Sequence, residues 1–110
     1  MSLRTTYTGA LDTKLAEARA AGRTWVLTTN ISDITTALNN AANSGVKSFT
    51  FTGGATYQSA DLKLAGALWE AHKTGILQGL AEEDLMGNEV IVSLNTADLS
   101  TVKIDIKFTF

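Results

Sequence analysis

Histidine, the side chain best suited to acid–base chemistry near neutral pH, occurs once in this 110-residue chain, at His72. Any histidine-assisted nucleophile or two-histidine metal site would therefore need this one residue. His72 lies on an apolar helical stripe one turn after Trp69, where a packed histidine with one hydrogen bond is the commoner role. The alternative is a small-molecule-binding domain with His72 and Trp69 in the wall of a pocket.

An acidic cluster and a pair of glycines have residue types found in metal-binding and phosphate-binding sites, but not the spacing that such sites need. Four carboxylates lie close together: Glu82, Glu83, Asp84 and Glu89. A calcium loop needs oxygen ligands at alternating positions around a tight turn, so we predict a solvated turn here. Gly53 and Gly54 follow a predicted strand, but the lysine of a phosphate-binding loop is missing, which favours a tight turn. We therefore expect a protein that is not an enzyme, with no catalytic residue, no cofactor and no metal.

The composition is that of one globular domain covering residues 1–110. Hydrophobic residues make up 45% of the chain and charged residues 18%, and the 9 basic residues are scattered among 11 acidic ones. This pattern predicts neither a nucleic-acid partner nor a membrane partner. There is no cysteine for a disulfide and no proline, so glycine and asparagine must mark the chain breaks.

The elements that would position these residues are read from the spacing of apolar side chains. Residues 102–110 alternate strictly between apolar and polar, which indicates a strand, and residues 23–29, 46–52 and 89–95 are also read as strands. Helices are predicted over residues 10–21, from about 31 to Gly45, and from a cap at Ser59 through a stripe beginning at Leu62. A break in that last helix at Gly75 is left open. The last two strands would form a hairpin across residues 96–101. The predicted fold class is α+β: a four-stranded mixed sheet with a C-terminal hairpin, covered on one face by three helices.

Two surfaces are candidates for contact between copies of the chain. The terminal strand is rich in β-forming residues and ends on a large apolar side chain; its candidate contacts are Ile106, Phe108 and Phe110. The last helix carries small side chains every four residues, which would let another backbone approach closely; its candidate contacts are Ala67, Ala71 and Gly75. Burial within a monomer and burial in a homo-oligomer both remain open for these residues.

Three segments carry a resemblance to a known group of proteins. They are residues 7–19 (Tyr-Thr-Gly-Ala-Leu-Asp-Thr-Lys-Leu-Ala-Glu-Ala-Arg), residues 67–71 (Ala-Leu-Trp-Glu-Ala) and the hairpin over 90–110. Together they resemble small uncharacterised proteins of tailed bacteriophages, of the marine cyanophage type. The resemblance implies a phage protein of the host bacterial cytoplasm or the virion. It carries over no functional residue.

The leading functional hypothesis is a non-enzymatic, self-associating phage protein that is structural or accessory to the virion. An alternative is an adaptor that binds another phage or host protein through an open edge of the sheet. The small-molecule-binding domain built on His72 and Trp69 ranks third.

Overall fold

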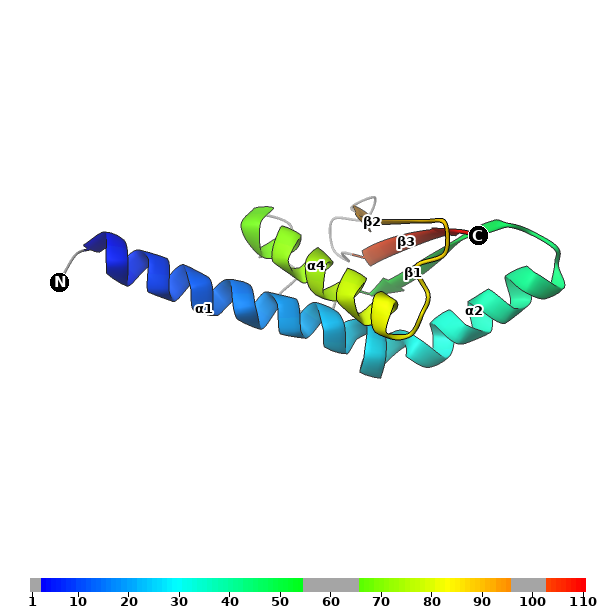
Figure 1. The fold of residues 1–110 in the computed structure, drawn as a ribbon, viewed down its shortest axis with the longest axis horizontal. Coiled ribbons are helices and arrows are strands. Elements are labelled where there is room, and N and C mark those ends of the chain that lie inside the picture. The colour runs from blue at the N-terminus through cyan, green and yellow to red at the C-terminus, as the bar shows by residue number, and fades with distance from the viewer. Residues whose placement is uncertain (1–2, 55–65, 96–102) are drawn as a thin grey trace.

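The computed structural model of the protein describes residues 3–54, 66–95 and 103–110 (Figure 1). In chain order the elements are α1 (Leu3–Thr24), the short π-helix η1 (Trp25–Asn30), α2 (Ile31–Asn43), β1 (Ser48–Gly54), α4 (Gly66–Glu82), β2 (Glu89–Asn95) and β3 (Lys103–Thr109). The α1 and α4 helices lie side by side, the strands form a layer next to α4, and α2 extends away from the N-terminus. The α+β class is therefore confirmed.

The described strands form one three-stranded antiparallel sheet in the order β1–β3–β2. The C-terminal hairpin is confirmed, because β2 pairs with β3 from Glu89 opposite Thr109 to Asn95 opposite Lys103. The prediction of a four-stranded mixed sheet covered by three helices is wrong. The sheet has no parallel pair among the described strands, and the α1–α4 pair forms the helical layer while α2 lies to one side.

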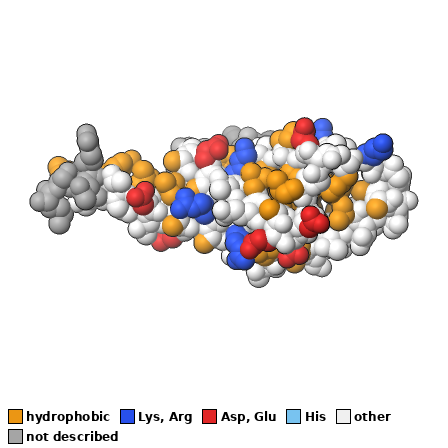
Figure 2. All heavy atoms as spheres, in the orientation of Figure 1, with side chains coloured by type: hydrophobic (Ala, Val, Ile, Leu, Met, Phe, Trp, Pro, Cys, Tyr) orange, Lys and Arg blue, Asp and Glu red, His pale blue; other side chains and the backbone are white. Residues whose placement is uncertain are grey.

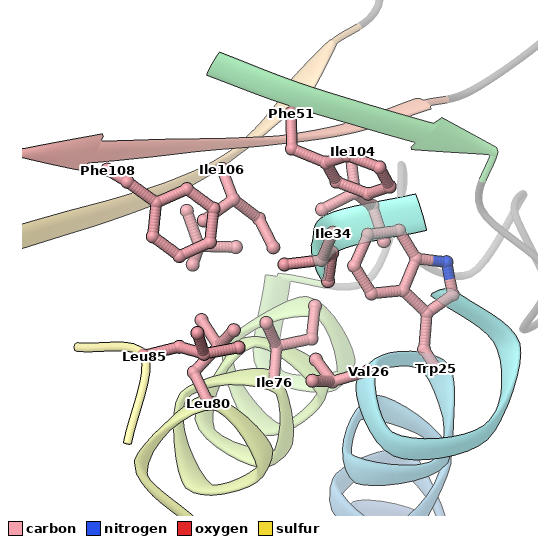
Figure 3. Close-up of a cluster of buried hydrophobic side chains, with 11 residues drawn as sticks. Trp25, Val26, Ile34, Phe51, Ile76, Leu80, Leu85, Ile104, Ile106 and Phe108 are labelled. Atoms are coloured by element: carbon pink, nitrogen blue, oxygen red, sulfur yellow. The ribbon is translucent and has the colours of Figure 1, made fainter. Parts of the chain in front are cut away.

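The hydrophobic core lies between the sheet and the helices (Figure 3). The alternation of β3 sends its apolar side chains to one face, and Figure 3 shows these side chains pointing toward α4. The residues that meet there are Ile104, Ile106 and Phe108 from β3 with Ile76 and Leu80 from α4, all essentially inaccessible to solvent. The buried face of the terminal strand is thus confirmed.

The predicted strand over residues 23–29 is wrong, because this segment is the end of α1 followed by η1. In this segment the adjacent Trp25 and Val26 are both buried in the hydrophobic core. The Asn30 side chain donates a hydrogen bond to the Trp25 carbonyl oxygen at 2.9 Å. The Trp25 indole N–H donates to the Gly54 carbonyl oxygen, also at 2.9 Å. Tertiary packing has therefore overridden the β-propensity of this segment.

The remaining helices follow the sequence more closely. Helix α2 ends where Gly45 adopts a positive φ of 72°, as expected for a glycine after a helix. Helix α4 continues through Gly75 to Glu82, so the break at Gly75 does not occur. The predicted cap at Ser59, the helix start at Leu62 and the connection over 96–101 lie outside the described residues.

Candidate functional site

The closest contact between elements is the crossing of α1 and α4, which run in parallel (Figure 1). A Cβ atom placed on Gly22 would lie 2.0 Å from the carbonyl oxygen of His72. One placed on Gly75 would lie 1.9 Å from the carbonyl oxygen of Arg19. Since real Cβ atoms do not come that close to backbone oxygens, only glycine fits at either position. The two helices therefore touch through their backbones.

The predicted close approach along the small side chains of α4 is confirmed, and the helix that approaches is α1 of the same chain. Gly75 lies against Arg19 of α1, Gly79 faces Val26, and Ala71 is also buried. Ala67, nearer the start of α4, stays exposed. An oligomer contact through Gly75 would have to displace α1, and Ala71 is itself buried, so of these candidates only Ala67 is available at the surface.

His72 lies inside the same crossing with no accessible surface. Its Nδ1 atom is 3.2 Å from the Ala18 carbonyl oxygen, and because that oxygen can only accept, Nδ1 carries the proton in the neutral ring. Burial lowers the pKa of His72, and the hydrogen bond to Ala18 opposes this shift. The Trp69 ring is 6.3 Å away, centroid to centroid. These two residues lie together, but His72 packs between helices and lines no accessible wall.

An ion pair joins the two helices where they end. The Arg23 guanidinium donates to both carboxylate oxygens of Glu82, at 2.6 and 2.9 Å. The hydrogen bond from Arg23 holds the pKa of Glu82 below its usual value. Both side chains are about half exposed, so water screens much of the attraction.

The candidate contacts of the terminal strand divide between core and surface. Ile106 and Phe108 are buried within the single chain, in the central strand of the sheet. Phe110 remains 40% exposed and stacks beside Phe108 and Phe49, with ring centroids 6.1 and 6.3 Å away. Of the three candidates, only Phe110 could reach a second chain without unfolding the first.

The other chemical candidates have structural roles. Among residues 3–54, 66–95 and 103–110, no three acidic or histidine side chains are grouped to hold a metal ion. Gly53 and Gly54 are not a turn but the last residues of β1, paired with Ile104 and Lys103. A Cβ atom on Gly53 would lie 2.7 Å from the Trp25 ring, so glycine makes room for the indole.

The N-terminal part of α1 is a surface that sequence reasoning missed. In the parallel pair Ala18 lies beside His72 and Gly22 beside Ile76, an offset of 54 residues (76 − 22). The same offset places the described start of α4, Gly66, beside residue 12 (66 − 54). Residues 3–11, which we call the arm, therefore extend beyond the described part of α4 (Figure 1).

The arm carries large apolar side chains on one face. Leu3 is 90% exposed and Tyr7 is 67% exposed, and both continue a four-residue spacing through the half-buried Leu11 and Leu15. Figure 2 shows hydrophobic side chains at the surface along this part of α1. The spacing of Leu3, Tyr7, Leu11 and Leu15 is the signal in the sequence that could have found it. The helix predicted over residues 10–21 includes only the last two residues of the arm.

The fold and these sites define an α+β protein with exposed apolar side chains on the arm and a histidine buried between α1 and α4. No protein family model matches the chain, and neither a curated protein nor a solved structure shows significant similarity to it. No helix in the described part of the chain combines the length and apolar character needed to cross a bilayer.

Proposed function

We propose that this is a non-enzymatic, self-associating protein whose arm packs against a second copy of the chain. The observation that carries the proposal is the apolar face of the arm. Leu3 and Tyr7 are large, exposed and aligned with the stripe that packs on α4 further along the same helix. A helical face of this kind is stabilised when another helix covers it.

The shape of the chain supports the same proposal. Its accessible surface is 6565 Å² for 11.7 kDa, whereas a monomer of this mass has about 5,900 Å². Its radius of gyration is 15.5 Å, whereas about 13 Å is usual for this length. Most single chains bury more of themselves than this one does, and association is the common way to cover such surplus surface.

The biological setting that we propose for this function is based only on the resemblance to small phage proteins. A structural or accessory role in a phage particle, in the host bacterial cytoplasm or the virion, is part of the proposal. Self-association does not depend on it, and can be tested with the purified chain.

The test substitutes two residues on the apolar face of the arm. Leu3→Glu combined with Tyr7→Glu should lower the mass measured by light scattering at tens of micromolar, because two charges would replace the contact. The fold should persist, since both side chains are exposed and acidic residues suit the N-terminal end of a helix.

The matched control adds the same two charges on the opposite face of α1. Thr13→Glu combined with Ala16→Glu changes exposed residues on that face and should keep the mass of the original protein. A chain that is monomeric without any substitution would overturn the proposal. Equal masses for the arm variant and the original oligomer would also overturn the arm as the contact.

A further inference from the structure

In the sheet formed by the described strands, β2 is one of the two outer strands. On the β1 side, the Phe110 N–H donates to the Lys47 carbonyl oxygen at 2.8 Å. On the other side, the Asn88 N–H donates to the Thr109 carbonyl oxygen at 2.9 Å. Because backbone groups alternate in direction along a strand, the odd-numbered residues of β3 and β2 bond one another. The groups that point out of the sheet belong to Val90, Val92 and Leu94.

Within the described residues, this edge has few of the features that usually block strand addition, and its one charged residue, Glu89, lies at the start of the strand. The strand contains no lysine, arginine, proline or glycine, and its outer face exposes Ile91 to 48%. The opposite edge, β1, is less suited to pairing. It ends in two glycines, and the Gly54 carbonyl oxygen already accepts a hydrogen bond from Trp25. Of the two outer strands, β2 is therefore better suited to pair with a further strand.

The β2 strand is held in a fixed register by polar contacts on the outer face of the sheet. One Asp105 carboxylate oxygen accepts from the Thr52 hydroxyl at 2.7 Å, and the other accepts from the Asn95 amide at 3.3 Å. These bonds join β1, β3 and β2 across the sheet. A strand held in this way presents its edge without first having to be ordered.

We propose that β2 pairs antiparallel with β2 of a second copy about a two-fold axis at Val92, joining the two sheets into one. The proposal extends the proposed self-association by a second contact. In this register Glu89 faces Asn95, Val90 faces Leu94 and Ile91 faces Ser93 of the other copy. No like charges face each other, and the apolar inner faces of the two sheets become continuous.

A second copy of the chain fits this edge better than an unrelated strand because β2 is complementary to itself. Residues that are diagonal across an antiparallel pair on one face lie within reach of each other. The two copies of Ile91 are diagonal neighbours beside the axis, so each covers a side chain that is half exposed in the single chain. Two separate contacts, the arm and β2, would then build an assembly larger than a dimer.

The experiment isolates the β2 contact by starting from the arm variant, Leu3→Glu with Tyr7→Glu. Light scattering should give a dimer of twice the 11.7 kDa chain mass. Adding either Ile91→Glu or Ile91→Lys should halve that mass, because like charges would then meet at the axis. Mixing the Ile91→Glu protein with the Ile91→Lys protein should restore the dimer, which a merely structural role of Ile91 would not produce.

The matched controls lie in the same row of the outer face, on the other edge. Thr50 and Ile91 both pair with Lys107, one from each side. Thr50→Glu and Thr50→Lys should keep the dimer. Circular dichroism should show that all these variants retain the fold, since both positions are exposed.

The outcomes separate the two contacts. An arm variant that is already monomeric, or that binds only a different protein through β2, overturns the β2 pairing and leaves the arm contact standing. Dissociation by the Thr50 variants but not by the Ile91 variants overturns it in favour of β1. If the Ile91 variants lower the mass and the arm variant leaves it unchanged, the β2 contact is supported and the arm contact is refuted.

Discussion

The two parts of α1 share one stripe but use it in opposite ways. Beyond the arm, Ala18 and Gly22 bring α1 so close to α4 that backbone meets backbone. In the arm the same stripe carries Leu3 and Tyr7, which are large and uncovered. Residue size along the stripe therefore determines which kind of surface can pack against it. Small residues permit a close helix contact within the chain, whereas large exposed ones offer area to another chain.

The largest expected effect comes from filling the close contact. Gly75→Ala should lower the free energy of unfolding by about 3 kcal/mol, because the new methyl group would meet the Arg19 carbonyl oxygen and force the helices apart. In the arm, a Cβ atom on Gly9 would meet nothing within 4 Å. Gly9→Ala should therefore raise the free energy of unfolding by about 0.5–1 kcal/mol, the usual gain in a helix interior. Urea denaturation measures both.

These two substitutions are chemically identical and should differ in sign, which makes them a direct test of the comparison. Gly22→Ala should behave like Gly75→Ala, since it would meet the His72 carbonyl oxygen. If Gly75→Ala were as stable as the original protein, α1 and α4 could not be in backbone contact.

A smaller effect should appear in the pH dependence of stability. Burial lowers the pKa of His72 in the folded chain, so the unfolded chain binds the proton more readily. The stabilisation from the neutral ring is fully present above the unfolded pKa of about 6.5 and is lost as the pH falls below it. Thermal melts between pH 7.5 and 5 should show this loss.

His72→Gln supplies the control for the pH dependence. The chain has a single histidine, so this variant should lose most of the change in melting temperature between pH 7.5 and 5. Its stability at pH 7.5 is a separate matter, because the Ala18 carbonyl oxygen must find a new donor. An unchanged pH profile in the variant would show that His72 is not buried in the helix crossing.

The strands were the part of the fold that could be predicted from the sequence. The alternation of apolar and polar residues in a strand is visible in the sequence itself. The predicted strand over 89–95 matches β2 residue for residue. The segment that begins at Trp25 has an equally β-like composition but forms a π-helix. Its conformation depends on a bond to Gly54 and a place in a core assembled from distant segments. Such information is absent from local propensity.

The surfaces were harder to predict than the strands. The small residues at Gly75 and Gly79 correctly indicated a close contact, but a spacing cannot tell whether the partner is the same chain or another. The arm was missed because its stripe of Leu3, Tyr7 and Leu11 is sparse among polar residues. Its exposure depends on how α1 packs against the rest of the chain, and local sequence does not give that arrangement.

The smallest expected effect lies at the end of the close contact between α1 and α4. Glu82→Gln removes the ion pair with Arg23, and it should lower stability slightly at neutral pH in low salt. Because the folded chain holds the pKa of Glu82 below its usual value, this contribution is present above pH 4.5 and is lost on further acidification.

Glu83→Gln removes the same charge one residue further along and should have less effect. The difference between the two variants should shrink in high salt, since both partners of the Arg23–Glu82 pair are half exposed. A large loss of stability from Glu82→Gln would show that this ion pair, and not the close approach at the glycines, provides most of the stabilisation of the α1–α4 contact. The contrast between the two parts of α1 would then depend on charge instead of on residue size.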